Sequence, residues 1–196
     1  MSLPQPLSRR LTRLGERLAA HQPAMGTDDP SLIWAAVSVV LAPSPDALLL
    51  IRRAERTGDP WSGHMALPGG RREPGDAALL DTAMRETREE LGLALERSQL
   101  IGTLDDMIPR TPVLPPVAVR PFVFSLPGRP ILVPNEEVAA AAWVSLDHLL
   151  DPATYHTARI DVRGAPREMP AYRFEDTIVW GMTERILTGL LAQLAR

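Results

Sequence analysis

Cysteine and lysine are both absent from the 196-residue sequence. The lack of cysteine excludes thiol catalysis, disulfide bonds and cysteine-ligated zinc sites. Because all 21 basic side chains are arginines, a Schiff base or a lysine nucleophile is excluded as well. These residues are balanced by 24 acidic ones, and a formal charge of -3 argues against a nucleic acid held mainly through its phosphates.

Long hydrophobic runs are missing too. The longest weakly polar run, residues 32–42, has about half of the roughly 20 residues that cross a bilayer, so it predicts a buried strand. Leucines recur at helical spacing in the basic residues 7–18, which predicts an amphipathic helix. Glu16 interrupts the basic stretch and no signal core follows, so we expect a helix packed on the domain of a cytoplasmic protein.

Length and patterning predict one α/β (α+β) domain, a mixed sheet packed between helices. Residues 1–29 are expected to form the N-terminal helix and a loop, and residues 30–196 the domain itself. A helix is predicted over residues 77–91, with Asp76 as its N-cap and Gly92 as its C-terminal stop. Strands are predicted at residues 32–41 and 47–51, which form a hairpin, and at 100–104 and 117–126. Helical segments are predicted at 146–150 and 178–194, and an exposed proline-rich loop at 109–116. Residues 138–144 fit either a helix or a strand.

Three carboxylates share one face of the predicted helix. At about 100° per residue, Glu86, Glu89 and Glu90 lie opposite an apolar stripe, where we expect them to be exposed. Glu86 and Glu90 repel each other at i,i+4, and Arg85 alone offsets the charge. A hard divalent cation, Mg²⁺ or Mn²⁺, would supply what is missing.

A glycine pair precedes this helix. Gly69 and Gly70 would allow backbone N–H groups to approach an anion, and Arg71 and Arg72 could contact phosphate oxygens. Metal and phosphate together indicate a phosphorylated substrate. A solvated charged helix after an ordinary glycine turn remains the alternative.

The segment GGRREPGDAALLDTAMRETREELGL, residues 69–93, resembles the Nudix box. That pattern has Gly, five residues, Glu, seven residues, and then Arg-Glu-apolar-x-Glu-Glu-x-Gly-apolar. The Arg-Glu-x-x-Glu-Glu-x-Gly core matches in full from Arg85 to Gly92. The spacing from Gly70 to Arg85 is one residue longer than the pattern, and Asp76, or less well Glu73, takes the first acidic position.

Flanking segments resemble the coenzyme A diphosphatase branch of Nudix hydrolases. They are LLLIRRAER and SGHMALPGG before the box, and NEEVAAAAWVSLDHLL and IVWGMTERILTGLL after it. Two departures are Ile51 in place of the branch's Thr, and Gly58-Asp59 near a position that is usually basic. The resemblance implies hydrolysis of coenzyme A to 3',5'-ADP and 4'-phosphopantetheine, by a possible homodimer. A hydrolase of ADP-ribose or another nucleoside diphosphate derivative, and a non-catalytic Nudix-like binding module, remain alternatives.

The resemblance also implies roles for individual residues. Glu86, Glu90 and Glu89 would hold the metal, Glu89 would orient or deprotonate the attacking water, and Arg85 would aim the carboxylates. The residues expected to bind substrate are Gly69, Gly70, Arg71 and Arg53, and Glu137 is a candidate for an additional carboxylate.

Other side chains have two readings each. His64 could contact substrate or be structural, and the pair Asp105 and Asp106 could line a pocket or form a turn. Adenine stacking and simple packing are both open for three tryptophans, Trp61, Trp143 and Trp180.

Overall fold

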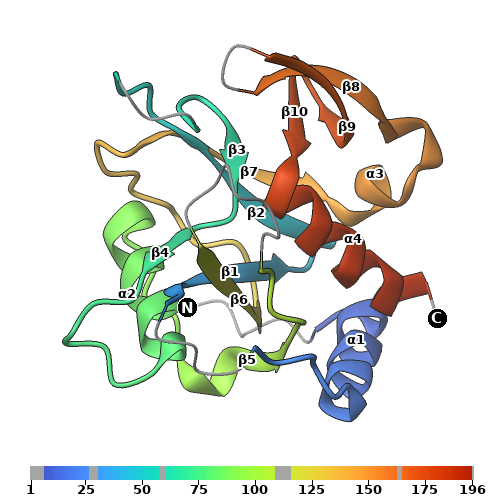
Figure 1. Ribbon diagram of the computed structural model, residues 1–196. Coiled ribbons are helices and arrows are strands. Elements are labelled where there is room, and N and C mark those ends of the chain that lie inside the picture. Colours follow the sequence, from blue (N-terminus) through green and yellow to red (C-terminus); the bar gives the residue numbers. More distant parts are fainter. Residues whose placement is uncertain (1–6, 27–30, 58–60, 109–115, 163–164, 196) are drawn as a thin grey trace.

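A mixed seven-stranded sheet forms the centre of the protein in the computed structural model, which describes residues 7–26, 31–57, 61–108, 116–162 and 165–195 (Figure 1). Its main path runs β3-β2-β1-β6-β5, while β4 pairs with β1 and β7 with β2. The β1–β6 pair is parallel and the other pairs are antiparallel, as a mixed sheet requires. The strands are β1 (Ile33–Ala42), β2 (Ala47–Arg53), β3 (Met65–Ala66), β4 (Gly69–Arg71), β5 (Leu100–Thr103), β6 (Val117–Ser125) and β7 (Val138–Ser145).

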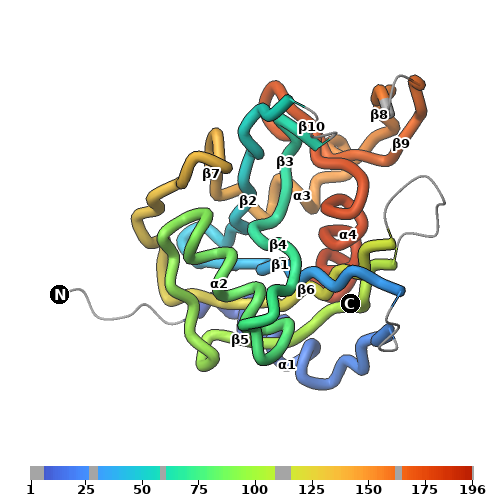
Figure 2. Tube along the Cα trace, turned by 60° about the vertical axis from the view of Figure 1, so that its left-hand side comes forward, coloured from blue at the N-terminus to red at the C-terminus, as the bar shows by residue number. Residues whose placement is uncertain are grey.

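Helices cover both faces of this sheet, which confirms the predicted fold class. α2 (Leu79–Leu91) packs on one face, and α1 (Arg9–Ala20) with α4 (Gly181–Ala195) on the other (Figures 1 and 2). Short helical turns complete the chain: α3 (Leu146–Leu150), η1 (Arg97–Gln99) and η2 (Pro152–Thr154). None of the helices in the described ranges is long and apolar enough to span a membrane.

The predicted N-terminal helix is present as α1. Its leucine stripe, Leu11, Leu14 and Leu18, is buried in the core that α4 also lines. Ser8 caps the helix by accepting a hydrogen bond from the Leu11 N–H at 3.1 Å. Arg17 donates to the carbonyl oxygens of Gln193 and Leu194, at 2.6 and 3.1 Å, so its charge lies at the C-terminal end of α4.

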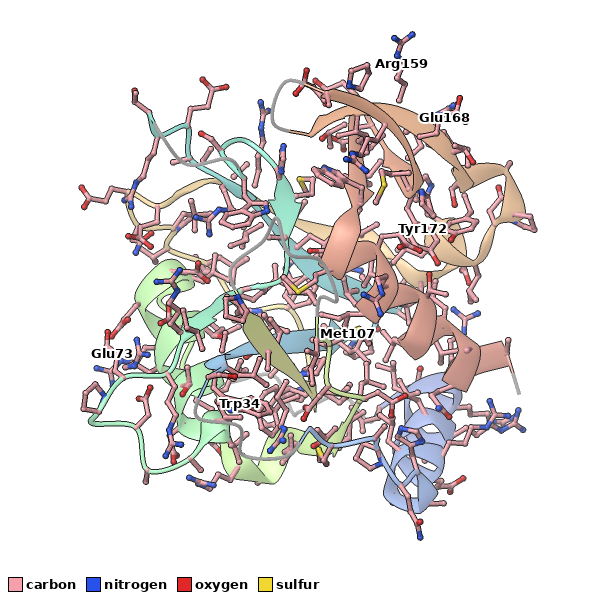
Figure 3. All side chains as sticks on the ribbon, in the orientation of Figure 1. Trp34, Glu73, Met107, Arg159, Glu168 and Tyr172 are labelled. Atoms are coloured by element: carbon pink, nitrogen blue, oxygen red, sulfur yellow. The ribbon has the colours of Figure 1, made fainter. Side chains whose placement is uncertain are left out.

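A separate three-stranded antiparallel sheet was not predicted. It consists of β8 (Tyr155–Val162), β9 (Ala165–Phe174) and β10 (Thr177–Trp180) in the order β10-β9-β8. The prediction of a helix from residue 178 is therefore wrong at its start, because Ile178–Trp180 pair with β9 and α4 begins only after them. Arg159 and Glu168, labelled in Figure 3, are exposed on the β8–β9 hairpin, whose outer part lacks the apolar alternation that indicates a strand.

The structure confirms one predicted hairpin and decides the state of one ambiguous segment. The β1–β2 hairpin is confirmed, with Leu41 opposite Leu48 across the turn. The ambiguous residues 138–144 lie in β7, which pairs with β2 along its length. Residues 58–60 and 109–115, which include most of the proline-rich segment, lie outside the described residues.

Candidate active site

The helix that carries the acidic cluster begins later than predicted. α2 starts at Leu79 with Ala78 as its N-cap residue, so the assignment of Asp76 as N-cap is wrong. The Asp81 carboxylate accepts a hydrogen bond from the Ala78 N–H at 3.0 Å and satisfies this end of the helix. The predicted stop is confirmed, because Gly92 adopts a left-handed conformation with φ of 64°.

Asp76 instead anchors the loop that precedes α2, residues 71–78. Its carboxylate is buried and accepts hydrogen bonds from Nε and Nη2 of Arg85, both at 3.0 Å, and from the Thr82 hydroxyl at 2.9 Å. The Arg85 hydrogen bonds hold the pKa of Asp76 well below its usual range, even though burial opposes this. The carboxylate therefore stays ionised and ties the loop to the helix.

Arg85 connects this anchor to the other carboxylates. Its Nη1 donates to Glu86 at 2.8 Å and to Glu89 at 2.9 Å, while Nη2 donates to the carbonyl oxygen of Arg71 at 3.1 Å. The hydrogen bonds to Asp76 and Glu86 raise the pKa of Arg85 above its usual value. One guanidinium thus sets the positions of Glu86 and Glu89 relative to the loop.

Glu90 differs from the exposed carboxylate that the helical pattern predicted. Its residue is only 3% exposed, and Oε2 accepts a hydrogen bond from the Gly69 N–H at 2.9 Å. Burial raises the pKa of Glu90 to about 8, although the Gly69 hydrogen bond acts in the opposite direction. The prediction of three exposed carboxylates is wrong here because β4 pairs with β1 directly beside this edge of α2.

Both glycines allow a close approach, Gly69 to the backbone of β1 and Gly70 to the Glu86 carboxyl group. Gly69 has a φ of 150°, and a Cβ there would lie 2.3 Å from the carbonyl oxygen of Ala36. A Cβ on Gly70 would lie 2.4 Å from Cδ of Glu86, so the Glu86 carboxyl group occupies the space over that residue. Burial raises the pKa of Glu86 as well, against the influence of Arg85.

We call Gly69, Gly70, Glu86 and Glu90 the cradle. Two further charged residues, Glu137 and Arg53, shift the pKa values of its carboxylates. After burial and nearer groups, the negative charge of Glu137 raises the pKa of Glu86 and Glu90, whereas Arg53 lowers that of Glu90. Glu137 forms an ion pair with Arg56 at 3.0 Å, and its carbonyl oxygen accepts a hydrogen bond from the Ala54 N–H at 2.8 Å. The ends of β2 and β7 therefore bring charge to α2.

The two arginines after the glycines differ. Arg72 donates through Nη2 to the carbonyl oxygens of Asp76 and Ala77, at 3.2 and 3.1 Å, and so supports the loop. Arg71 is exposed, and its contact with Arg85 is made by its backbone carbonyl oxygen rather than by its side chain. Glu73, labelled in Figure 3, lies at the outer edge of the same loop, 3.9 Å from Nη1 of Arg85.

Asp105 and Asp106 have structural roles in the fold. Asp106 forms two 2.8 Å hydrogen bonds with Arg120 and accepts the Gly26 N–H at 2.6 Å. Asp105 accepts the Ala24 N–H at 2.8 Å and lies 3.1 Å from His21. These contacts fasten the segment after α1 to the β5–β6 edge, away from the cradle.

Sequence reasoning missed a pair of buried hydroxyl groups under the acidic cluster. Thr87 donates to Ser38 of β1 at 2.8 Å, and Ser38 lies 3.1 Å from the Ala83 carbonyl oxygen; both residues are fully buried. The available signal was a serine in the middle of an apolar strand and a threonine on the buried side of the helix. This pair fixes the rotation of α2 on the sheet.

The cradle fits a divalent cation shared with a ligand. Within the described ranges, no three Asp, Glu or His side chains converge as a complete ligand set, and Glu89 turns to Arg85 instead. Mg²⁺ is commonly bound by one or two carboxylates, with substrate phosphates and water completing its shell. Glu86 and Glu90 could serve as such carboxylates, because a bound cation would offset the desolvation that raises the pKa of both groups.

Comparison with known proteins gives a consistent result. The family model described as NUDIX domain matches residues 33–162. An uncharacterized Nudix hydrolase, NudL of Cronobacter sakazakii, is 30% identical over 94% of this chain and 94% of its own length. An uncharacterized Schizosaccharomyces pombe protein is 41% identical over 58% of this chain, but the match spans only 36% of that protein. A MutT/nudix family crystal structure from Enterococcus faecalis superposes with a TM-score of 0.59 at 19% identity, covering 98% of this chain and 76% of that one, which supports the fold alone.

Proposed function

This chain belongs to the Nudix hydrolase family, whose members act on diphosphate bonds, and we propose that it cleaves the diphosphate linkage of coenzyme A or an acyl-coenzyme A. The products would be 3',5'-ADP and 4'-phosphopantetheine. The observation that carries the proposal is a pair of carboxylates, the buried Glu90 and the half-buried Glu86, held against a glycine turn on the family's acidic helix.

Mg²⁺ or Mn²⁺ is the proposed cofactor, with Glu86 and Glu90 as its principal protein ligands and Glu89 and Glu137 as additional carboxylates. Bound there, the ion would polarise the phosphate oxygens and stabilise negative charge on the leaving group. Gly69 supports this arrangement by donating its N–H to Glu90, and Gly70 by leaving space for Glu86.

The remaining steps fall to the chain's own side chains. Glu89, exposed and oriented by Arg85, is proposed to accept the proton of the water that attacks one phosphorus. Arg85 orients both Glu86 and Glu89, because its Nη1 donates a hydrogen bond to each carboxylate. Arg71, which is exposed, and Arg53, whose charge reaches Glu90, are the proposed contacts for phosphate oxygens.

Coenzyme A is preferred over ADP-ribose because of the segments around the box. LLLIRRAER contains most of β2, and IVWGMTERILTGLL spans β10 and most of α4, so both resemblances fall on regular elements. The additional residue of the box lies in the loop before α2, where Asp76 still reaches Arg85. Coenzyme A also carries a 3'-phosphate that arginines can bind in charge-assisted hydrogen bonds.

A substrate panel tests the proposal. We expect kcat/KM with Mg²⁺ to be highest for coenzyme A, markedly lower for 3'-dephospho-coenzyme A, and lower for ADP-ribose, with products identified by mass. A preference for ADP-ribose would overturn the coenzyme A assignment while leaving the hydrolase in place. Absence of turnover on every diphosphate tested would favour the non-catalytic binding module.

A further inference from the structure

Three aromatic side chains gather beside the charged end of β2. Trp61 and His64 lie in the turn before β3, and Trp180 ends β10 (Figure 1). We call these three residues the aromatic corner. Trp61 is 36% exposed, and His64 and Trp180 are partly exposed, so this π surface is not part of the closed core.

The corner joins two sheets that the chain order separates. The rings of His64 and Trp180 meet edge to face, with centroids 5.0 Å apart and an interplanar angle of 67°. β10 contacts β3, and both views show the two strands side by side (Figures 1 and 2). The second sheet therefore places β10, which ends in Trp180, beside β3, the strand that precedes the glycine turn.

Hydrogen bonds from the backbone N–H groups of Arg53 and Arg56 connect the end of β2 to the turn that carries the aromatic corner. The Arg53 N–H donates to the His64 carbonyl oxygen at 3.0 Å, and the His64 N–H donates to the Trp61 carbonyl oxygen at 3.2 Å. In the same turn, Ser62 Oγ accepts the Arg56 N–H at 2.6 Å. The charge of Arg53 also lowers the pKa of Glu90, and Arg56 forms an ion pair with Glu137, so the turn that carries His64 is hydrogen-bonded to residues that influence the cradle.

The other two tryptophans are placed differently. The guanidinium carbon of Arg120 lies 5.2 Å from the centroid of the Trp34 ring on β1. The guanidinium carbon of Arg129 lies 5.8 Å from the ring centroid of Trp143, which is on β7. Neither has a contact with the turn that carries Arg53 and Arg56 among those described above. This difference separates Trp61 and Trp180 from tryptophans that pack locally.

We propose that the aromatic corner is the subsite for the purine base of the nucleotide substrate. A purine stacks on the face of Trp180, whose orientation the edge-to-face contact with His64 holds, while the attached phosphates extend past Arg53 toward Glu86 and Glu90. Stacking on aromatic side chains is favourable for any base because each has a π face, and the arginines provide the complementary charge. The inference rests on the proposed function only in assuming that the ligand is a nucleotide.

Binding of two probes without metal tests the subsite. Adenosine 5'-monophosphate and ribose 5-phosphate share the phosphate and the sugar, so the ratio of their Kd values isolates the contribution of the base. We expect the wild-type chain to bind the nucleotide more tightly, and Trp180→Leu to reduce that advantage by about tenfold, as expected for one lost stacking contact. Trp180→Phe should restore most of it.

Trp143→Leu is the matched control, because it removes a tryptophan from outside the corner. A merely structural effect of Trp180→Leu would weaken both probes equally, and His64→Ala provides a second variant if Trp180→Leu does not fold. An unchanged ratio in Trp180→Leu and His64→Ala would overturn the inference. Hydrolysis of coenzyme A with an unchanged ratio would leave the proposed function standing, whereas base-dependent binding without any hydrolysis would leave only the subsite.

Discussion

A buried carboxylate is the feature of single residues that most shapes this site. Glu90 loses its contact with water on folding and gains one backbone N–H donor, that of Gly69. One neutral hydrogen-bond donor offsets only part of the cost of burying a charge. The folded chain therefore favours protonated Glu90 until a cation provides the missing compensation.

Replacing Glu90 should change how stability depends on pH. The pKa of Glu90 is about 8 in the folded chain, against 4.5 for an ordinary glutamate. A carboxyl group with a raised folded pKa does not destabilise the protein at low pH. Its cost grows as pH rises from the unfolded pKa of 4.5 to the folded pKa of about 8, and it levels off above that value. With chelator present, we expect the Tm of Glu90→Gln relative to wild type to increase from about pH 5 to about pH 9.

The measurement is a series of thermal melts across that range. Glutamine keeps an acceptor oxygen for the Gly69 N–H, so the variant should fold. Glu168→Gln, which removes an exposed carboxylate from the β8–β9 hairpin, is the control for loss of surface charge. A Tm difference for Glu90→Gln that stays constant with pH would contradict the assigned burial effect.

The glycine turn offers a matched pair of substitutions. In Gly70→Ala the new Cβ would collide with the Glu86 carboxyl group, whereas in Gly75→Ala it would meet no atom within 4 Å. We expect Gly70→Ala to weaken Mg²⁺ binding by at least about tenfold, as for other changes that displace metal ligands, and Gly75→Ala to leave it unchanged. Calorimetric titration of both variants checks this, and equal affinities would show that Glu86 does not depend on this space.

At the scale of elements, α2 must hold one rotation on the sheet for Glu86 and Glu90 to meet the turn. The hydroxyl pair of Thr87 and Ser38 lies on the buried side of the helix and links it to β1. Both hydroxyls are fully buried, but Ser38 also reaches the Ala83 carbonyl oxygen, so loss of the Thr87 hydroxyl removes one hydrogen bond, worth about 0.5–1.5 kcal/mol, without leaving Ser38 unpaired. The same hydrogen bond therefore supports both stability and the direction of the carboxylates.

Thr87→Val tests this link, since valine keeps the shape and removes the hydroxyl. We expect it to lower the free energy of unfolding by about 0.5–1.5 kcal/mol and also to weaken Mg²⁺ binding, with Thr87→Ser restoring the metal affinity. Thr154→Val is the matched control, because that buried hydroxyl donates to carbonyl oxygens of His148 and Asp151 away from α2. If both valine variants lose stability with unchanged metal affinity, the pair is structural only.

The sequence predicted elements where a local pattern decides the structure. Helical spacing and Gly92 identified α2, and alternating or continuous apolar runs identified β1, β2, β5 and β6. The β8–β9 hairpin escaped because most of its side chains are exposed, and its stability comes from cross-strand pairing rather than from an apolar face. Alanines left β7 undecided until its pairing with β2 was known.

The candidate site was predictable in composition but not in environment. Arg85, Glu86, Glu89 and Glu90 could be read from adjacent positions on one helix. The burial of Glu90 could not be predicted from the helix alone. It depends on β4, about twenty residues earlier in the chain, and on the pairing of β4 with β1. The loop role of Asp76 was hidden in the same way, since its partner Arg85 lies nine residues further along the chain, more than two helical turns beyond the predicted cap.

At the scale of the whole molecule, distant segments meet at one end of the fold. β2 brings Arg53, β7 brings Glu137, β10 brings Trp180, and the β4 turn lies against α2. Both sheets and the helix α4 must be in place for these side chains to be neighbours. Any ligand that binds several of them stabilises the folded chain as a unit.

Metal binding should therefore raise the thermal stability of the entire chain. A ligand at about 100 times its Kd adds about 2.7 kcal/mol to the folded state, which corresponds to a rise in Tm of roughly 5 °C or more for a domain of this size. We expect Mg²⁺ and Mn²⁺ to produce this rise, and the double variant Glu86→Gln/Glu90→Gln to lose it, when melts are compared at constant ionic strength. Chelation with EDTA should lower the wild-type Tm again and abolish diphosphate hydrolysis in the same samples. Full turnover after exhaustive EDTA treatment, or an equal Tm rise in the double variant, would show that the carboxylate pair is not where the ion binds.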